Sequence, residues 1–293
     1  MKQITENVYA ADNYAGDNPA YVKTAEGIVI IDPPQMPSVA VELLDIVKSQ
    51  GPLKWLINTE HHPDHTFGNY YFNNMAPVVA HRELYSRFMT APGLDCYHKN
   101  LDETKVNDPE GLKYYPEENE YWQNCNRPNV LFDDYLKITV GEHDFECYHT
   151  GGHTIDQICV YCPQERVLFP GDTIFSQVQI FFAEADPFII LEALDFIEQF
   201  DAQYIVPGHG AICTKDAINE NRAFVLDWIS AVQNGIAKGW SKDECMEHIS
   251  FADRYPIDVG LDAVLHDLQK GNSGKLYDYL TSKGRGRGYT LTP

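Results

Sequence analysis

Six consecutive residues, 60–65 with the sequence EHHPDH, concentrate three histidines and two carboxylates. Since the whole chain has only 11 histidines, this density indicates a shared purpose. Imidazole nitrogens and carboxylate oxygens bind divalent metal ions such as Zn²⁺, Fe²⁺ and Mn²⁺. Three later segments, ECYHTGGHT, RVLFPGDTIF and YIVPGHG, place His153, Asp172 and His209 in short loops after apolar runs. A single such histidine usually belongs to a packed core, but four segments of one design predict a metal centre.

The elements that must position these loops are short strands. Apolar runs rich in β-branched and aromatic residues recur along the chain and predict strands. These runs are AYVKT, GIVIID, KWLIN, PVVA, FECYH, QICVY, RVLF and YIVPG. Helical periodicity lies between some of them, as in residues 38–51, where Ser38 is the expected N-cap. The last third is mostly helical, and SKDE at 241–244 matches a capping box. Alternating strands and helices predict a layered α/β fold.

From about residue 91 to 129 the sequence is rich in Tyr, Asn and Asp and shows no sustained periodicity. A stretch this long inside a compact domain is usually functional or mobile. We therefore expect either an insertion that lines or covers a cleft, or a surface excursion. Its candidate substrate contacts are Tyr97, His98, Lys99, Tyr114 and Tyr115. Beyond Asp172, Phe181 and Phe182 are available either to the cleft wall or to the core.

The order and spacing of the four ligand-bearing segments resemble the metallo-β-lactamase fold superfamily, whose first motif is H-x-H-x-D-H. In that family a later histidine stands in a G-H-T turn, an aspartate in G-D and a histidine in P-G-H-G, which TGGHT, PGDTIF and PGHG match here. IVIIDPP, with Asp32, is similar to the family's early strand and turn. The resemblance implies an αββα sandwich of two mixed β-sheets flanked by helices. It also implies a domain over residues 1–215, with extra C-terminal helices in 216–293 packed on it.

Carried over position by position, the resemblance implies two divalent metal ions. It assigns seven side chains as ligands, in two sets joined by a bridge. They are Glu60, His62 and His153 for the first ion, Asp64, His65 and His209 for the second, and Asp172 between them. A hydroxide held by two such ions attacks an ester, lactone or amide-type bond of a small molecule, and Asp64 is placed to accept its proton. His61, at the unspecified motif position, should point elsewhere, and His149 should be structural.

Glu60 stands where the family usually has histidine. Two divalent ions carry four positive charges and the three carboxylates of this set remove three, whereas the usual set removes only two. A less positive, oxygen-rich first site favours Fe²⁺ or Mn²⁺ over Zn²⁺. The same carboxylate also fits a diiron redox enzyme, although flavodiiron members place their glutamate at the position of His62. A metal-binding scaffold without turnover is the third alternative.

The composition and charge of the chain limit the classes of binding partner and the cellular compartment that we expect. The net charge of -21 repels phosphate backbones and argues against nucleic acid. The sequence contains no apolar run of about 18 residues, so we expect no membrane span. The N-terminus lacks the apolar stretch of a signal peptide, so we do not expect secretion by that route. Seven cysteines without framework spacing predict reduced thiols in the cytoplasm, and Cys159 and Cys162 are expected to pack in a strand and turn. The expected partner is a small-molecule substrate, and a homo-oligomer is compatible with the sequence.

Overall fold

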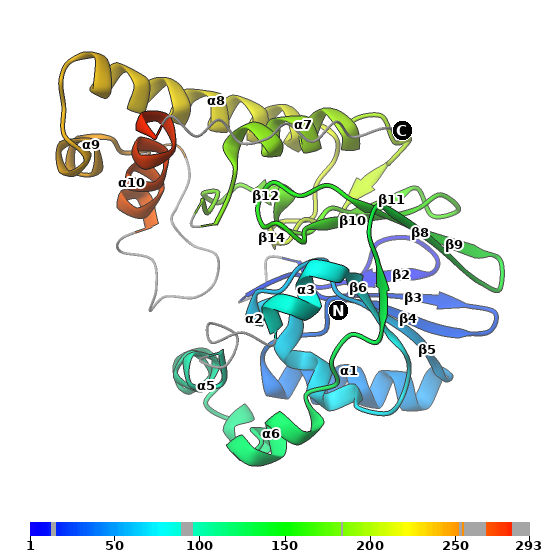
Figure 1. Ribbon diagram of the computed structural model, residues 1–293. Helices are drawn as coiled ribbons and strands as arrows, with labels where there is room; N and C mark the ends of the chain where they lie inside the picture. Colours follow the sequence, from blue (N-terminus) through cyan, green and yellow to red (C-terminus); the bar gives the residue numbers. More distant parts are fainter. Residues whose placement is uncertain (13–15, 89–95, 183, 252–253, 255–267, 283–293) are drawn as a thin grey trace.

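The computed structural model describes residues 1–12, 16–88, 96–182, 184–251, 254 and 268–282. Its elements form four layers, in which two β-sheets pack face to face between two layers of helices (Figure 1). The predicted αββα sandwich is therefore confirmed, with its mixed sheets and its additional C-terminal helices. The division of the chain at residue 215 stays a prediction.

The first sheet contains seven strands that follow one another in chain order. They are β1 (Lys2–Gln3), β2 (Val8–Ala10), β3 (Ala20–Thr24), β4 (Gly27–Ile31), β5 (Leu53–Ile57), β6 (Val78–His81) and β7 (Val130–Phe132). Strands β1 to β4 pair antiparallel, whereas β4 to β7 pair parallel through longer connections. Because parallel strands end at the same edge of a sheet, the loop after β5 opens at that edge.

The second sheet contains five strands, in the order β13-β11-β10-β9-β8. Their bounds are β8 (Tyr135–Val140), β9 (His143–His149), β10 (Ile158–Cys162), β11 (Val167–Phe169) and β13 (Tyr204–Ile205). β8 to β11 form an antiparallel meander, and β13 pairs parallel with β11. A separate parallel pair joins β12 (Phe175–Ser176) to β14 (His209–Gly210). Every predicted strand run thus overlaps a strand of the structure.

The core explains why β4 reads as an unbroken apolar run. Val29 and Ile31 face the second sheet, while Ile28 and Ile30 face helix α1 (Pro37–Gln50) on the outer side. A strand that is covered on both faces needs apolar residues at every position rather than at alternate ones. The loops that leave such a strand start from a rigid base, which suits a site that must hold several side chains in place.

The predicted cap of helix α1 is wrong. The helix begins at Pro37, after Met36, whose side chain makes no capping hydrogen bond. Ser38 already lies inside the first turn, and its backbone N–H donates to Asp108 Oδ2 at 2.8 Å. A carboxylate at a helix N-terminus satisfies an unpaired N–H and complements the helix dipole. The cap therefore comes from a residue 70 positions away, which no local motif can reveal.

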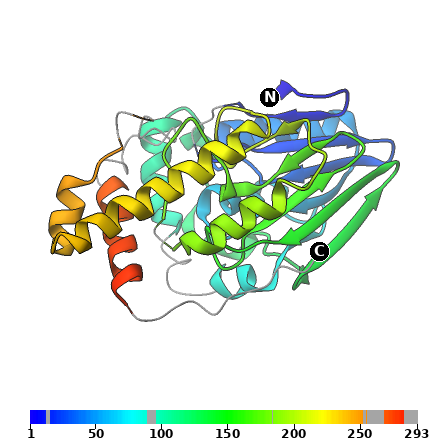
Figure 2. The same ribbon diagram turned by 90° about the horizontal axis from the view of Figure 1, so that it is seen from above.

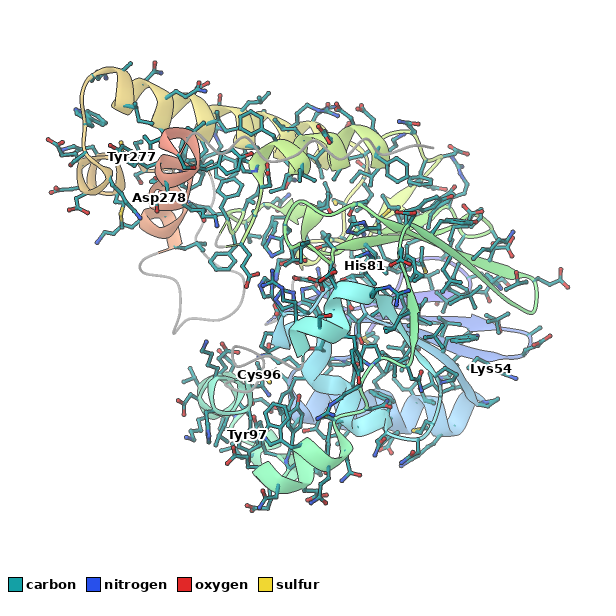
Figure 3. All side chains as sticks on the ribbon, viewed as in Figure 1. Lys54, His81, Cys96, Tyr97, Tyr277 and Asp278 are labelled. Atoms are coloured by element: carbon teal, nitrogen blue, oxygen red, sulfur yellow. The ribbon has the colours of Figure 1, made fainter. Side chains whose placement is uncertain are left out.

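The described part of the predicted insertion is helical, which its sequence pattern did not indicate. It contains α5 (Cys96–Asn107), the 3₁₀ turn η2 (Gly111–Tyr114) and α6 (Glu118–Asn124). Cys96, Tyr97 and Tyr121 pack with Phe67 in a core of their own (Figure 3). Tyrosines supply this core, and Tyr97 Oη donates to the Pro116 carbonyl at 2.7 Å. Because its buried residues are tyrosines, cysteines and the polar Asn100 and Thr104 rather than aliphatic residues, the segment lacks the usual hydrophobic periodicity.

The second sheet is covered by α7 (Pro187–Ile197) and α8 (Asp216–Ala237), which lie beside each other in both ribbon views (Figure 2). α9 (Lys242–His248) and α10 (Leu268–Thr281) lie at one end of the sandwich. Short elements complete the described chain: α2 (Pro63–Thr66), η1 (Phe67–Phe72), α3 (Arg82–Phe88) and η3 (Gly171–Thr173). The predicted capping box is confirmed, since Ser241 and Glu244 cap the start of α9 reciprocally. No helix among the described residues has the length and apolarity to cross a membrane.

The cysteines pack as expected for isolated thiols. All seven are free, and Cys159 and Cys162 lie in β10. Residues three apart in a strand face opposite sides, and these two belong to different core clusters. The prediction of ordinary strand packing for this pair is confirmed. The cytoplasmic location stays a prediction.

Candidate metal centre

The ligand-type side chains lie on loops that follow strands, at one edge of the two sheets. Residues 60–65 follow β5, and His62 precedes the short helix α2, which Pro63 starts. His153 stands in the turn between β9 and β10, Asp172 in η3 after β11, and His209 at the start of β14. The two sheets thus bring together residues that are more than 140 positions apart.

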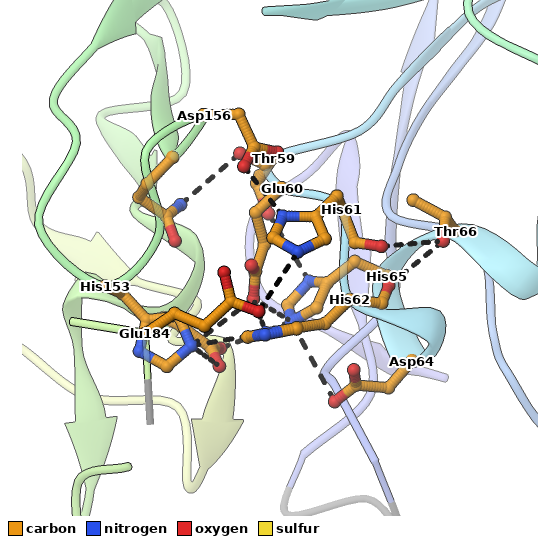
Figure 4. Close-up of polar contacts among 12 residues, drawn as sticks. Thr59, Glu60, His61, His62, Asp64, His65, Thr66, His153, Asp156 and Glu184 are labelled. Atoms are coloured by element: carbon orange, nitrogen blue, oxygen red, sulfur yellow. Dashed lines mark hydrogen bonds and ion pairs between the residues drawn. The ribbon is translucent and has the colours of Figure 1, made fainter. Parts of the chain in front are cut away.

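Four of the side chains form a first group, in which one ligand atom of each lies within 4.8 Å of the others. They are Glu60, His62, His153 and Asp172. Glu60 Oε1 lies 2.9 Å from His62 Nδ1 and 3.6 Å from His153 Nε2 (Figure 4). His153 Nε2 also lies 3.2 Å from Asp172 Oδ2. This arrangement matches the set of side chains predicted for the first ion, together with the predicted bridge.

Asp64, His65 and His209 form a second group, again within 4.8 Å. His209 Nε2 lies 3.3 Å from Asp64 Oδ2 and 3.3 Å from Asp172 Oδ2. His65 Nε2 lies 3.3 Å from Asp172 Oδ1. Asp172 therefore contacts both groups, as a bridging carboxylate would. The structure brings all seven predicted side chains together, and their role as ligands stays a prediction.

Several buried polar atoms in these groups fit bound cations. Glu60 Oε2, His65 Nε2 and Asp172 Oδ1 are inaccessible to solvent and have no hydrogen-bond partner in the protein. A buried polar atom without a partner costs about 1–3 kcal/mol, more when it is charged. Three carboxylates and four imidazoles are a suitable donor set for two divalent ions. The residues present therefore fit a pair of metal ions.

The buried side chains of the cluster shift one another's pKa values. Burial by itself would lower the pKa of His65, but the surrounding carboxylates, Asp172 first, raise it well above its usual range. Burial would raise the pKa of Asp172, but His209, His65 and His153 together keep it well below its usual range. Ligand histidines must be neutral to bind a metal ion, so metal uptake must release protons to solvent.

Asp32 holds His65 in place. Its Oδ2 lies 3.0 Å from His65 Nδ1 and accepts from Thr59 Oγ1 at 2.6 Å, while its Oδ1 accepts from the Thr59 N–H at 2.8 Å. This contact favours the tautomer with the proton on Nδ1 and leaves Nε2 free for a metal ion. Asp32 has φ of 46°, an uncommon backbone conformation for a residue before proline. Local strain of this kind is concentrated at functional sites.

We expect Asp32→Asn to weaken metal binding by about 10- to 100-fold. The amide nitrogen would replace Oδ2 and face the Nδ1–H of His65, so the ring would move its proton to Nε2, the nitrogen that faces the other ligands. Titration of the metal-free protein with Mn²⁺ and Zn²⁺ measures the effect, and Asp156→Asn, which changes a buried carboxylate that bonds His61 instead of a candidate ligand, is the control. Unchanged affinity in Asp32→Asn would show that Asp32 does not set the tautomer.

Two glycines make room in the loops around Asp172. A Cβ on Gly208 would lie 1.9 Å from Asp172 Oδ1. Gly171, with φ of +51°, would place a Cβ 2.3 Å from Gln157 Nε2. Gly208 is therefore needed for the close approach of its loop to Asp172, and Gly171 for the close approach of Gln157 and Thr59 to the PGD turn.

His61 and His149 lie outside the two ligand groups, which together contain seven residues. His61 Nδ1 lies 2.7 Å from Asp156 Oδ1, and its Nε2 lies 3.7 Å from Glu184 Oε1 (Figure 4). Burial would lower the pKa of His61, but its bonds to Asp156 and Glu184 raise it to about 10. His149 stacks on His81 with ring centroids 3.8 Å apart and joins the two sheets. Both histidines thus make contacts that fit structural roles.

The predicted substrate contacts of the insertion are divided by the structure. Tyr97 is buried, so the prediction that it contacts substrate is wrong. Tyr115 is half-buried, and its ring stacks on that of Phe67. Tyr114, His98 and Lys99 lie on the surface. Their contact with substrate stays a prediction.

Two phenylalanines face the histidines of the candidate centre. The ring of Phe181 lies 6.4 Å from that of His62 and 6.2 Å from that of His153, whereas Phe182 is fully buried in the core. Sequence reasoning missed Phe175, whose ring stacks on His209 at 5.2 Å. Its position three residues after Asp172 was the only signal in the sequence.

The comparisons with known proteins agree with this geometry. A family model described as the metallo-beta-lactamase superfamily matches residues 17–209. The probable hydroxyacylglutathione hydrolase of Schizosaccharomyces pombe is 29% identical over 168 residues, 55% of this chain and 50% of that protein. The metallo-beta-lactamase type 2 of Elizabethkingia meningoseptica is 27% identical over 237 residues, 78% of this chain and 81% of that protein. The chain thus spans half the length of the yeast relative.

Solved structures show the same fold. A metallo-beta-lactamase from Pontibacter korlensis has a TM-score of 0.60 and 21% identity, covering 77% of this chain and 98% of its own. The sec-alkylsulfatase Pisa1 from Pseudomonas sp. has a TM-score of 0.71 and 15% identity, covering 99% of this chain and 51% of its own. At these identities the likeness concerns the fold alone.

Proposed function

This chain belongs to the metallo-beta-lactamase superfamily, and from that premise we propose that it is a hydrolase that depends on two divalent metal ions. The observation that carries the proposal is the position of Asp172, whose two oxygens lie 3.2–3.3 Å from histidine nitrogens of both ligand groups. Two divalent ions held here would lower the pKa of a water molecule between them and polarise the bond to be cleaved.

The side chains of the protein would perform the remaining tasks. Asp64 is the candidate proton acceptor: burial would raise its pKa, but His65 and His209 lower it, so the carboxylate is ionised at neutral pH. A carboxylate in this state can accept a proton from attacking water and pass it to the leaving group. Asp32 would keep His65 oriented, and the rings of Phe175 and Phe181 would limit the access of bulk water.

We propose that the substrate is a small molecule with an ester, lactone or amide-type bond and without a strong negative charge. The yeast relative is named as a hydroxyacylglutathione hydrolase and the bacterial relative as a β-lactamase. The fold alone does not choose between such substrates. Two further acidic side chains lie around the ligand groups in the described chain: Glu184, which is beside His61 and His62 and pairs with Arg87, and Asp17, whose pKa burial raises well above its usual range. Burial and the nearby negative charge of Asp64 raise the pKa of Glu103, on α5, to about 7. Such acidic surroundings disfavour an anionic substrate.

A diiron redox enzyme is the alternative, and one contact supports it. Glu60 Oε1 lies 3.3 Å from His65 Nε2 of the second group, besides its contacts within the first. Glu60 can therefore supply negative charge to both metal positions, which favours iron or manganese over zinc and would stabilise a ferric state.

The test combines metal analysis with turnover. Protein produced without added metal is analysed for zinc, iron and manganese, and is then stripped and reloaded with each metal in turn. A panel of ester, lactone and amide probes is assayed with and without dioxygen. We expect about two ions per chain and hydrolysis that needs no dioxygen. Activity only with dioxygen would favour the redox enzyme, and metal binding without turnover would favour a scaffold.

A further inference from the structure

Residues 175–182, which we call the wall segment, carry the aromatic rings that face the candidate metal centre. The segment leaves η3 just after Asp172 and leads towards α7. The ring of Phe175 stacks on His209, and the ring of Phe181 lies beside His62 and His153. Within the segment, only Phe175 and Ser176 belong to a strand, so its backbone needs other partners to keep a fixed conformation.

Asn272 on α10 supplies partners on both sides of Phe181. Its Nδ2 donates to the Ile180 carbonyl at 2.6 Å, and its Oδ1 accepts from the Phe182 N–H at 2.8 Å. Asn272 is fully buried, as are Ile180 and Phe182. One amide side chain therefore fixes the backbone before and after Phe181, in the way that a neighbouring strand would.

A second asparagine repeats this arrangement at the other end of the wall segment. Asn221 on α8 accepts from the Phe175 N–H at 3.0 Å and donates to the Phe175 carbonyl at 2.9 Å. Both helices that grip the segment belong to the C-terminal part of the chain, and a bond of 3.1 Å from Trp228 Nε1 to Ser273 Oγ joins them. Buried hydrogen bonds thus connect the C-terminal helices to the wall segment.

We propose that Asn272 is a positioning residue for substrate binding, and that the Phe181 ring it holds selects substrates with an uncharged apolar group next to the bond to be cleaved. The inference rests on the proposed hydrolase function for its reaction. A ring beside the metal-facing histidines offers apolar surface to such a group, and fixing the ring in advance lowers the entropy cost of binding. We call the two hydrogen bonds from Asn272 to the backbone on either side of Phe181 the clamp. Without the clamp, we expect the Phe181 ring to lose its fixed position and the seven ligand side chains to keep theirs.

The experiment compares three variants with the natural chain. Asn272→Asp keeps the size and the acceptor but removes the donor to Ile180, and Phe181→Ala removes the ring and leaves the clamp. Ser273→Ala is the matched control, because it removes a buried hydrogen bond of the same helix, the one from Trp228, and leaves both hydrogen bonds from Asn272 to the wall segment in place. Hydrogen exchange of the 175–182 region is measured on each. Binding of acetohydroxamate and octanohydroxamate is measured on the metal-loaded proteins, and kcat and KM are measured for an acetate and an octanoate ester with one leaving group.

We expect Asn272→Asp, but not Ser273→Ala, to speed exchange in the wall segment. Asn272→Asp and Phe181→Ala should each weaken octanohydroxamate binding and raise KM for the octanoate ester about tenfold, with acetyl probes changed less than about twofold and metal content unchanged. Equal effects of Asn272→Asp and Ser273→Ala, equal losses for both chain lengths, or no effect of Phe181→Ala would each overturn the inference. Failure of the natural chain to hydrolyse any probe would contradict only the proposed function, because exchange and hydroxamate binding need no turnover.

Discussion

We expect Asp172→Asn to release at least one metal ion and to lower hydrolysis on the order of a thousandfold or more, because the proposed bridging carboxylate would serve both ions. Its Oδ2 lies 3.2 Å from His153 Nε2 and 3.3 Å from His209 Nε2, and its Oδ1 lies 3.3 Å from His65 Nε2. The amide removes one negative charge and places an N–H₂ group where a cation would bind. Elemental analysis after dialysis and rates with the most active ester probe measure the two effects.

Asp156→Asn is the matched control for this variant. Asp156 is as deeply buried as Asp172 and also bonds a histidine, His61, at 2.7 Å, but it belongs to neither of the two ligand groups. We expect Asp156→Asn to retain both ions. If Asp172→Asn also retained both ions, the bridging assignment would be wrong, whatever happened to the rate.

Glu60→His shifts the metal preference towards zinc. The substitution restores the nitrogen donor usual at this position and removes one of three carboxylates, so the pair of ions regains one positive charge. Zinc accepts nitrogen-rich sites readily, whereas Fe²⁺ and Mn²⁺ depend more on oxygen donors. We expect the ratio of zinc to manganese affinity to rise by about tenfold or more, measured by competition between the two metals in the stripped protein.

Glu60→Gln separates the charge from the donor type. It keeps an oxygen donor of nearly the same shape at this fully buried position but carries no charge. A shift in Glu60→His alone would indicate that the nitrogen donor decides the preference, and a shift in both would indicate the charge. An unchanged preference in both variants, with circular dichroism showing an intact fold, would mean that Glu60 does not coordinate.

The sequence by itself predicted eight of the fourteen strands that the structure describes, and the family resemblance of its motifs identified the seven side chains of the candidate centre. Strands such as β4 are recognisable because burial on both faces imposes apolar residues at each position, from residue 27 to 31. The candidate ligands are recognisable because a metal centre needs particular donor types, and the loops around them need glycine where Asp172 makes its close approach. Requirements of this kind act on each residue locally, so they leave a pattern that can be read along the chain.

Only the tertiary structure decided how that centre is supported. Asp108 caps α1, and Asn272 holds the backbone around Phe181, across separations of 70 and about 90 residues. The helices of the insertion bury tyrosines whose hydroxyls find partners only after folding, as Tyr97 does at Pro116. A single Asp or Asn is compatible with many surroundings. Its partner is set by how the layers pack, so a hydrogen bond between distant segments leaves no periodic trace in the sequence.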